Sequence, residues 1–226
     1  MKETKTIMRL FAFYDRTNLV QFLEEQSEQG WLLTGISLGY KFRRVEPKKR
    51  HFCVVYLPKA SSQNTYQWEF LEYCQHAGWA LLVANQQMHV FCSERDNPVS
   101  IETDPTIEVE NIHKSAKKTH LTCFYIELFV GMQQLVHFLM RLMDDDLSHT
   151  LSRPIHLFNL FLGLLIIALS LVEIFGYFHW HQKAKDAAVQ GMFTPTPDHS
   201  VFRSIILLIL LVMLIMLPIV SYFSYF

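Results

Sequence analysis

Hydrophobic and polar positions follow different patterns in the two halves of the chain. Residues 6–14, 32–44, 51–57, 79–84 and 88–93 are rich in β-forming side chains with partial alternation, which predicts strands. Two amphipathic stretches end at Gly30 and Gly78 and predict helices, the first capped by Asp15 or Thr17 and the second opened by Asn64 or Thr65. Beyond residue 118 the alternation gives way to long apolar runs.

The first half contains an internal repeat. The frame Phe-Leu-Glu-x5-Gly-Trp-x-Leu spans residues 22–33 and again 70–81, 48 residues later. A repeat at a fixed period indicates one supersecondary unit used twice. We therefore predict a duplicated βαβ unit in the order β-α-β-β-α-β-β, a ferredoxin-like α+β sandwich with both helices on one face of an antiparallel sheet.

This fold gives specific segments a role. Residues 45–50 are expected to form a hairpin tip between strands 32–44 and 51–57, and Asn85-Gln86-Gln87 a second turn. Trp31 and Trp79 are expected to cover the junction of helix and sheet, since a large ring buries much apolar area. The alternative is that the two rings line a ligand groove.

Three windows in the second half have the length of membrane spans: 120–143, 155–178 and 202–225. The third has no polar side chain over 205–217, whereas the first contains several, so a buried soluble helix is the alternative for that window. We predict an α+β domain over 1–95, a linker or juxtamembrane segment over 96–118 and an all-α transmembrane region of three helices over 119–226.

Charge supports this division and orients the chain. Residues 1–118 carry 15 Lys/Arg and 14 Asp/Glu, but residues 119–226 carry only five and seven. Lys114, Lys117 and Lys118 precede the first span, and Lys183, Lys185 and Arg203 flank the loop between the second and the third. Because basic residues concentrate on the cytoplasmic side, we predict a multi-pass protein of the cell membrane with a cytoplasmic N-terminus and an extracytoplasmic C-terminus.

Cationic and aromatic residues alternate in one segment of the domain. The cations are Lys41, Arg43, Arg44, Lys48, Lys49 and Arg50. Strand alternation places Tyr40 and Phe42 on one face and Lys41 and Arg43 on the other, which favours a solvated charged hairpin. Contact with anionic lipid or an acidic protein partner is the second interpretation, and a nucleic-acid site is the third and weakest.

Polar side chains form a stripe on each of the first two spans. His120, Glu127 and Gln134 recur every seven residues on the first, and Asn159, Ser170 and Glu173 follow one side of the second. These stripes predict that the two spans pack on each other or on a partner. Glu127 and Glu173 are expected at similar depth near the cytoplasmic side, either as a proton- or cation-handling pair or as structural groups paired with His120, His181 or Arg203.

Motifs for catalysis and cofactor binding are not recognised in the sequence. The four cysteines have no C-x-x-C spacing and are interpreted as small apolar residues in a reducing compartment. Glu102 and Asp104 alternate like cation ligands, but no further ligand follows at the spacing of a metal loop. The sequence therefore predicts a non-enzymatic protein with no cofactor and no metal site.

The chain resembles a family of uncharacterised bacterial membrane proteins. The resemblance lies in the paired motifs Glu24…Gly30-Trp31 and Glu72-Tyr73…Gly78-Trp79, with Phe13-Tyr14 before them and Ile101–Asp104 after them. In that family a domain of unknown function precedes a few hydrophobic helices, often encoded beside PadR-type regulators. The resemblance implies a role in a regulated membrane or envelope response, and it implies no catalytic residues.

From these observations we expect a sensor, scaffold or regulator whose cytoplasmic domain binds a protein partner or self-associates, next to membrane lipid. The alternative is an accessory or core subunit of a small transporter that uses Glu127 and Glu173. A membrane-anchored nucleic-acid binder is a third and weaker hypothesis.

Overall fold

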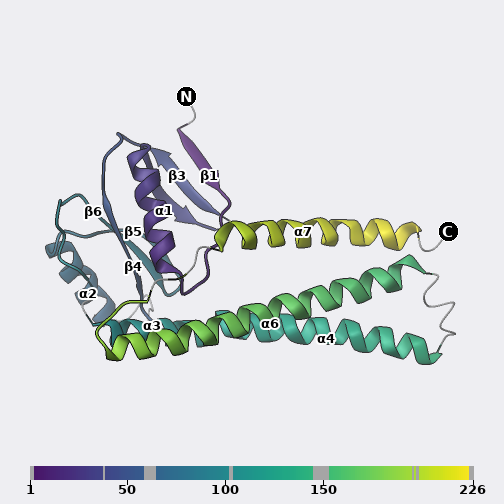
Figure 1. The fold of residues 1–226 in the computed structure, drawn as a ribbon. Helices are drawn as coiled ribbons and strands as arrows, with labels where there is room; N and C mark the ends of the chain where they lie inside the picture. The colour runs from purple at the N-terminus through teal and green to yellow at the C-terminus, as the bar shows by residue number, and fades with distance from the viewer. Residues whose placement is uncertain are drawn as a thin grey trace. The chain divides into compact units, whose positions relative to one another are not determined.

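The computed structural model describes residues 3–37, 39–58, 65–101, 104–144, 153–194, 196 and 199–223. The chain divides into two compact units, which are described separately. The first unit comprises residues 1–117 and 180–204, and the second comprises residues 118–179 and 205–226. Figure 1 labels the helices and strands along the chain.

The first unit contains an α+β region with two three-stranded antiparallel sheets. Its elements are β1 (Thr4–Ile7), α1 (Arg16–Glu28), β2 (Trp31–Ile36), β3 (Tyr40–Arg44), β4 (His51–Tyr56), α2 (Thr65–His76), β5 (Ala80–Asn85) and β6 (Met88–Ser93). One sheet has the strand order β1-β3-β2 and the other β4-β6-β5. In each half the last strand therefore lies between the other two.

The repeat is confirmed, but its unit is βαββ rather than the predicted βαβ. Each half runs strand, helix, strand, strand, and the two halves have the same strand order. Both sheets carry a register shift in the strand that follows the helix, between Leu33 and Gly35 and between Leu81 and Val83. These shifts lie 48 residues apart, so the repeat includes backbone irregularities as well as side chains.

Three details of the predicted strands are wrong. Residues 32–44 are not one strand but the hairpin β2–β3, in which the amide of Ser37 donates to the carbonyl of Gly39. Residues 45–50 are not a hairpin tip, because β3 and β4 belong to different sheets. The first strand covers Thr4–Ile7 instead of 6–14. The turn through Gln86 is confirmed, and this residue has a φ of 53°.

Close packing explains why the β2–β3 hairpin turns at Gly39. A Cβ atom at this position would lie 2.8 Å from the carbonyl oxygen of Ile7, in the neighbouring strand β1. Only glycine permits that approach. A strand pattern averaged over 32–44 does not show this contact, because β1 is distant in the sequence.

Both helices end at a glycine in the left-handed region, as predicted. Gly30 has a φ of 81° and Gly78 a φ of 91°. The surroundings differ, since a Cβ at Gly30 would lie 2.9 Å from the backbone oxygen of Val45, whereas one at Gly78 would lie 2.3 Å from Nε of the Arg95 side chain. A flexible side chain can move aside more readily than backbone.

The two tryptophans of the repeat occupy different environments. Trp79 is buried in a cluster with Val55, Cys74 and Phe91, and its Nε1 donates to the carbonyl of Val99 at 2.7 Å. Trp31 is half-buried under two cations, with Nζ of Lys5 4.4 Å and Cζ of Arg44 5.0 Å from the ring centroid. The second copy of the repeat thus supplies a core residue and the first a cation-capped surface residue.

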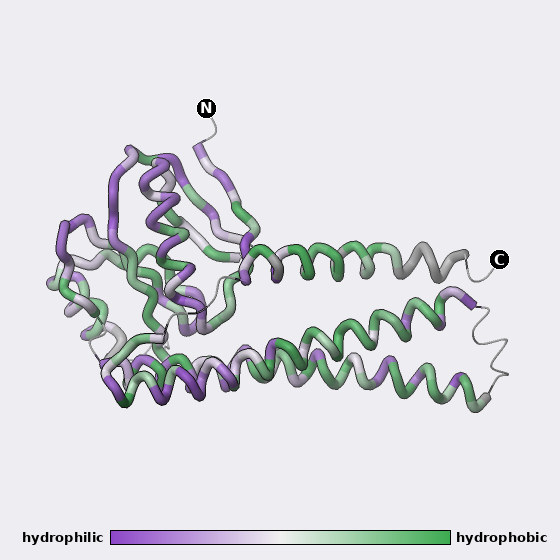
Figure 2. The backbone as a smooth tube through the Cα atoms, in the orientation of Figure 1, coloured by the Kyte–Doolittle hydropathy of each residue, from purple (hydrophilic) through white to green (hydrophobic). Residues whose placement is uncertain are grey.

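Long helices follow the α+β region. They are α3 (Pro105–Lys118), α4 (His120–Asp144), α6 (Pro154–Val189) and α7 (Ser200–Phe223). The helical stretch Pro105–Met143 and helix α6 are each long and apolar enough to cross a membrane, and Figure 2 shows their hydrophobic stretches. Helix α7 covers most of the third predicted window, whose last two residues lie outside the described part of the chain.

Helix α6 is longer than the predicted span. Its 36 residues correspond to about 54 Å, whereas the hydrocarbon core of a bilayer is about 30 Å thick. Its last part, residues 180–189, belongs to the first unit, together with α3. These two segments are called the stalk below. Ile112, Ala116, Ala184 and Ala188 are buried in it.

Candidate functional site

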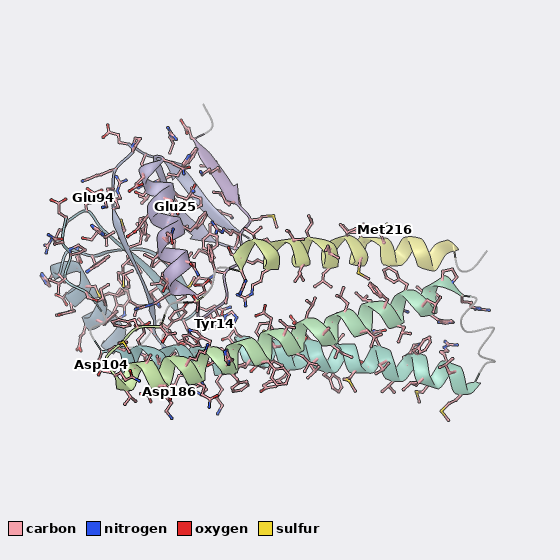
Figure 3. The ribbon with its side chains drawn as sticks, in the orientation of Figure 1. Tyr14, Glu25, Glu94, Asp104, Asp186 and Met216 are labelled. Atoms are coloured by element: carbon pink, nitrogen blue, oxygen red, sulfur yellow. The ribbon has the colours of Figure 1, made fainter. Side chains whose placement is uncertain are left out.

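Three consecutive residues at the start of α1 contact segments far away in the sequence. They are Tyr14, Asp15 and Arg16, called the α1-start tripeptide below, and all their contacts described here lie within the first unit. Tyr14 is labelled in Figure 3. Each of the three residues contacts a segment that adjoins one of the apolar helices.

Asp15 holds the segment between α6 and α7. This residue, one of the two predicted caps, is the N-cap of α1. It is only 2% exposed and accepts a hydrogen bond from the backbone amide of Asn18 at 3.3 Å. The same carboxylate oxygen accepts one from the hydroxyl of Thr196. The side-chain amide of Asn18 also donates a hydrogen bond to the carbonyl of Thr196 at 2.7 Å. A helix cap therefore also fastens a connecting segment to the domain.

Arg16 forms an ion pair with the start of α3. Its Nη2 lies 2.6 Å from Oε2 of Glu108, whose side chain is 8% exposed. Glu108 is in the first turn of α3, where the helix dipole favours a negative charge. The guanidinium carbon of Arg16 also lies 5.2 Å from the ring centroid of Phe193. Arg16 thus links the domain to α3 and to the segment before α7.

Tyr14 and its preceding loop contact α6 and α7. The ring of Tyr14 stacks on Trp180 of α6 at 4.7 Å with an interplanar angle of 24°. In the preceding loop, Nε of Arg9 donates a hydrogen bond to the hydroxyl of Ser200 at 2.7 Å. The backbone amide of Leu10 donates one to the hydroxyl of Ser204 at 3.0 Å. The loop before α1 therefore holds the first turn of α7.

The stalk contains a stacked histidine pair. The rings of His113 from α3 and His181 from α6 lie 4.2 Å apart with an interplanar angle of 14°. Burial lowers the pKa of His113, and the charge of Lys117 lowers it further. Burial also lowers the pKa of His181, and the charges of His113 and Lys185 lower it further. In both rings the folded environment therefore disfavours the protonated form.

The predicted basic segment is divided by the fold. Tyr40 and Phe42 are buried and Lys41 and Arg43 exposed, as the alternation predicted. Arg44 and Lys49 are also exposed.

Arg50, by contrast, is only 8% exposed. It donates to Glu94 at 2.9 Å and to the hydroxyl of Ser27 at 3.1 Å. Lys48 donates to the other oxygen of Glu94 at 2.8 Å, and these two hydrogen bonds lower the pKa of Glu94. Arg50 is therefore buried and paired, and its contacts with Ser27 and Glu94 fix the connection between the two halves.

In the second unit, α4 and α6 approach closely at two glycines. A Cβ at Gly131 would lie 2.7 Å from Ile167 and 3.0 Å from the carbonyl oxygen of Gly163. A Cβ at Gly163 would lie 2.8 Å from Cβ of Gln134. Small residues of this kind let helix backbones approach each other.

The polar residues predicted on these helices take different positions. Glu127 of α4 and Glu173 of α6 lie near enough for their charges to interact. Ser170 is buried and donates to the carbonyl of Ile166 in its own helix at 2.9 Å. His120 is half-buried at the start of α4. Glu127 and Glu173 thus lie within range of each other's charge, whereas Ser170 bonds within its own helix.

Gln134 and Asn159 line an open cavity on the α4–α6 pair. The cavity has a volume of about 520 Å³ and is lined by Gln133, Gln134, Val136, His137, Met140 and Asn159. It is called the polar groove below. In the described residues, no group of three or more His, Cys, Asp or Glu side chains could hold a metal ion.

Residues 17–125 match DUF2812, a protein family of unknown function. The match extends from α1 through strands β2 to β6 and helix α3 into the first part of α4, and β1 precedes it. The comparisons with curated proteins and with solved structures give no match.

Sequence reasoning identified Asp15 only as a helix cap. Its contact with Thr196 joins residues 181 positions apart, and no local pattern signals such a contact.

Proposed function

We propose that this chain is a non-enzymatic, multi-pass membrane protein whose cytoplasmic α+β domain binds a protein partner and acts as a sensor, scaffold or regulator. The single observation that carries the proposal is the set of contacts made by the α1-start tripeptide. Tyr14, Asp15 and Arg16 link one helix of the domain to segments next to all three apolar helices. A change in the arrangement of the spans would therefore alter the contacts at the start of α1.

The proposed topology agrees with these contacts. Residues 180–204 lie between the second and third predicted spans and belong to the same unit as residues 1–117. Both segments must then be on one side of the membrane, as the positive-inside rule predicts for a cytoplasmic N-terminus. Three spans would leave the C-terminus outside.

The cationic surface supports a protein or lipid partner rather than nucleic acid. Arg50 is buried, the exposed Lys48 is paired with Glu94, and Lys41 and Arg43 lie on the strand face opposite to Tyr40 and Phe42. A nucleic-acid site needs clustered cations with stacking aromatic rings beside them. The absence of salt-dependent retention of DNA or RNA by the full-length protein would remove that hypothesis.

Partner capture with a matched charge-reversal set tests the proposal. Proximity labelling from the N-terminus in living cells, combined with purification in mild detergent, is expected to identify a protein partner of the wild type. Arg16→Glu and Glu108→Arg should each change its recovery, and the double variant should restore it, because the reversed pair re-forms. If the wild type captures no partner, or if neither single variant changes capture, the proposal is wrong.

A second candidate function rests on Glu127 and Glu173. Two interacting carboxylates in apolar helices are a typical feature of ion or proton pathways. A transporter subunit would show flux in proteoliposomes, and Glu127→Gln and Glu173→Gln would each reduce it. Absence of flux in the wild type, or unchanged flux in both variants, contradicts this alternative.

A further inference from the structure

The α1-start tripeptide bridges the two helices of the stalk. Arg16 pairs with Glu108 of α3 at 2.6 Å, and the ring of Tyr14 stacks on Trp180 of α6 at 4.7 Å. All four residues belong to the first unit. Because one short segment holds both helices, it can keep both contacts only while α3 and this end of α6 stay together.

The histidine pair lies between the same two helices. The rings of His113 from α3 and His181 from α6 are 4.2 Å apart and nearly parallel, at 14°. His181 directly follows Trp180 in the chain, and the centroids of these two rings are 6.4 Å apart. A displacement of His181 therefore also displaces the ring that stacks on Tyr14.

Cations accompany the histidine pair on both helices. Lys117 stands four residues after His113 and Lys185 four residues after His181, so each lysine lies one turn further along the same helix face. Burial is the main cause of the lowered pKa of each ring, and the charges of Lys117 and Lys185 add to it. The other charged side chains of the stalk and the tripeptide are exposed, paired or hydrogen-bonded: Asp15, Arg16, Glu108, Glu110, Lys114, Lys118, Lys183 and Asp186.

We propose that the histidine pair is a proton-operated switch of the α1-start tripeptide. With both rings neutral, the pair stacks and holds α3 against the end of α6. With both rings protonated, two like charges face each other beside Lys117 and Lys185, and their repulsion separates the helices.

Separation of the helices changes one contact of the tripeptide. The ion pair of Arg16 with the buried Glu108 is the stronger of the two bridging contacts, because its loss would leave a buried carboxylate without a partner. The stack of Tyr14 on Trp180 is therefore the contact that breaks. The inference rests on the proposed function, since it names cytoplasmic acidification as the signal that changes partner binding through these residues.

Proton linkage sets the direction of the switch. The pKa values of both histidines are lowered in the closed stalk, whereas rings released into water regain an ordinary pKa of about 6.5. The open stalk therefore binds more protons than the closed stalk, and acidification favours it. We expect the stalk to be closed at pH 7.5 and to open as the pH falls below about 6.5.

Fluorine NMR of the full-length protein in nanodiscs tests the switch. The four tryptophans are labelled as 5-fluorotryptophan, and Trp180→Phe assigns the signal of Trp180. This signal should move between pH 7.5 and pH 5.5, whereas that of Trp79, which is buried in the domain core, should stay fixed. Tyr14→Leu should give at pH 7.5 a Trp180 signal close to that of the wild type at pH 5.5, which separates loss of the stack from titration of the neighbouring ring.

Matched variants assign the response to the histidine pair. His113→Gln/His181→Gln should abolish the movement, because glutamine is polar but does not titrate. His179→Gln is the control, since this histidine is exposed on α6 two residues before His181, and it should leave the movement unchanged. Lys117→Gln/Lys185→Gln keeps both rings and should move the transition to lower pH, because fewer charges then oppose protonation of the closed stalk.

The outcomes separate this inference from the proposed function. A Trp180 signal that does not respond to pH, a response that persists in His113→Gln/His181→Gln, or a response that is lost in His179→Gln overturns the switch. Capture of the protein partner should differ between pH 7.5 and pH 5.5 in the wild type but not in the double histidine variant. Equal capture at both pH values overturns the switch alone, whereas absence of capture at either pH contradicts the proposed function.

Discussion

The ion pair between Arg16 and Glu108 should respond very differently to loss of either partner. The Glu108 side chain is 8% exposed, and that of Arg16 is 21% exposed. Replacing Arg16 by Ala leaves a buried carboxylate without its 2.6 Å partner. Removal of one member of a buried pair costs about 3–5 kcal/mol. We place the cost here at about 2–3 kcal/mol, because the first turn of α3 still stabilises the carboxylate.

Replacing Glu108 by Gln should cost less, about 1 kcal/mol. The Arg16 guanidinium keeps its contact with the ring of Phe193 and part of its solvent exposure, and the Gln oxygen can still accept a hydrogen bond. The structure thus predicts an asymmetry of about 1–2 kcal/mol between two substitutions that break the same contact.

Hydrogen exchange on the full-length protein in nanodiscs measures this asymmetry locally. A loss of 2–3 kcal/mol corresponds to roughly 30- to 150-fold faster exchange of the amides near the starts of α1 and α3. Arg16→Ala should reach this range, and Glu108→Gln should stay near tenfold or below. Peptides from β5 and β6 provide an internal control and should keep their wild-type rates.

The result that would refute this reasoning is equal exchange in both variants, or a larger effect of Glu108→Gln. Either outcome would mean that burial of the carboxylate does not determine the free energy of the contact. The double charge reversal of Arg16 and Glu108 gives an independent check, since a true pair should recover part of the loss of each single reversal.

The remaining predictions concern pH, glycine geometry and thiol reactivity. The pKa values of His113 and His181 are lowered in the folded protein, so the unfolded chain binds more protons, and stability should fall as the pH drops below about 6.5. Thermal unfolding at pH 7.5 and 5.5 should show this fall, and His113→Gln should reduce it; an unchanged pH dependence in the variant contradicts the role of the pair. Gly30→Ala should cost about 2–3 kcal/mol and Gly78→Ala about 1–2 kcal/mol, because backbone at the first site cannot yield as the Arg95 side chain can. Urea unfolding of both variants measures the difference, and the reverse order would argue against it. Burial raises the pKa of Cys74 and of Cys92 to about 11. Neither thiol should therefore react with iodoacetamide at pH 8 until denaturant is added. Mass spectrometry of native and denatured samples measures this, and alkylation of either thiol in the native sample would contradict the prediction.

The sequence by itself determined the parts of this protein that depend on local pattern. The repeat of 48 residues, the helix ends at Gly30 and Gly78, a cap at Asp15 or Thr17 and the presence of long apolar helices could all be predicted from it. These features follow from backbone conformation and from which face of an element is apolar, and both leave a periodic signal in neighbouring residues.

Only the tertiary structure decided which elements are partners. It divided residues 31–44 into two strands, placed β3 and β4 in separate sheets and buried Arg50 against Glu94. It also brought the α1-start tripeptide to Glu108, Trp180 and Thr196. Periodicity reports that a side chain is apolar or polar on one face, but not which distant group it meets, because such contacts depend on how loops close and elements pack. The candidate site consists of contacts of this kind.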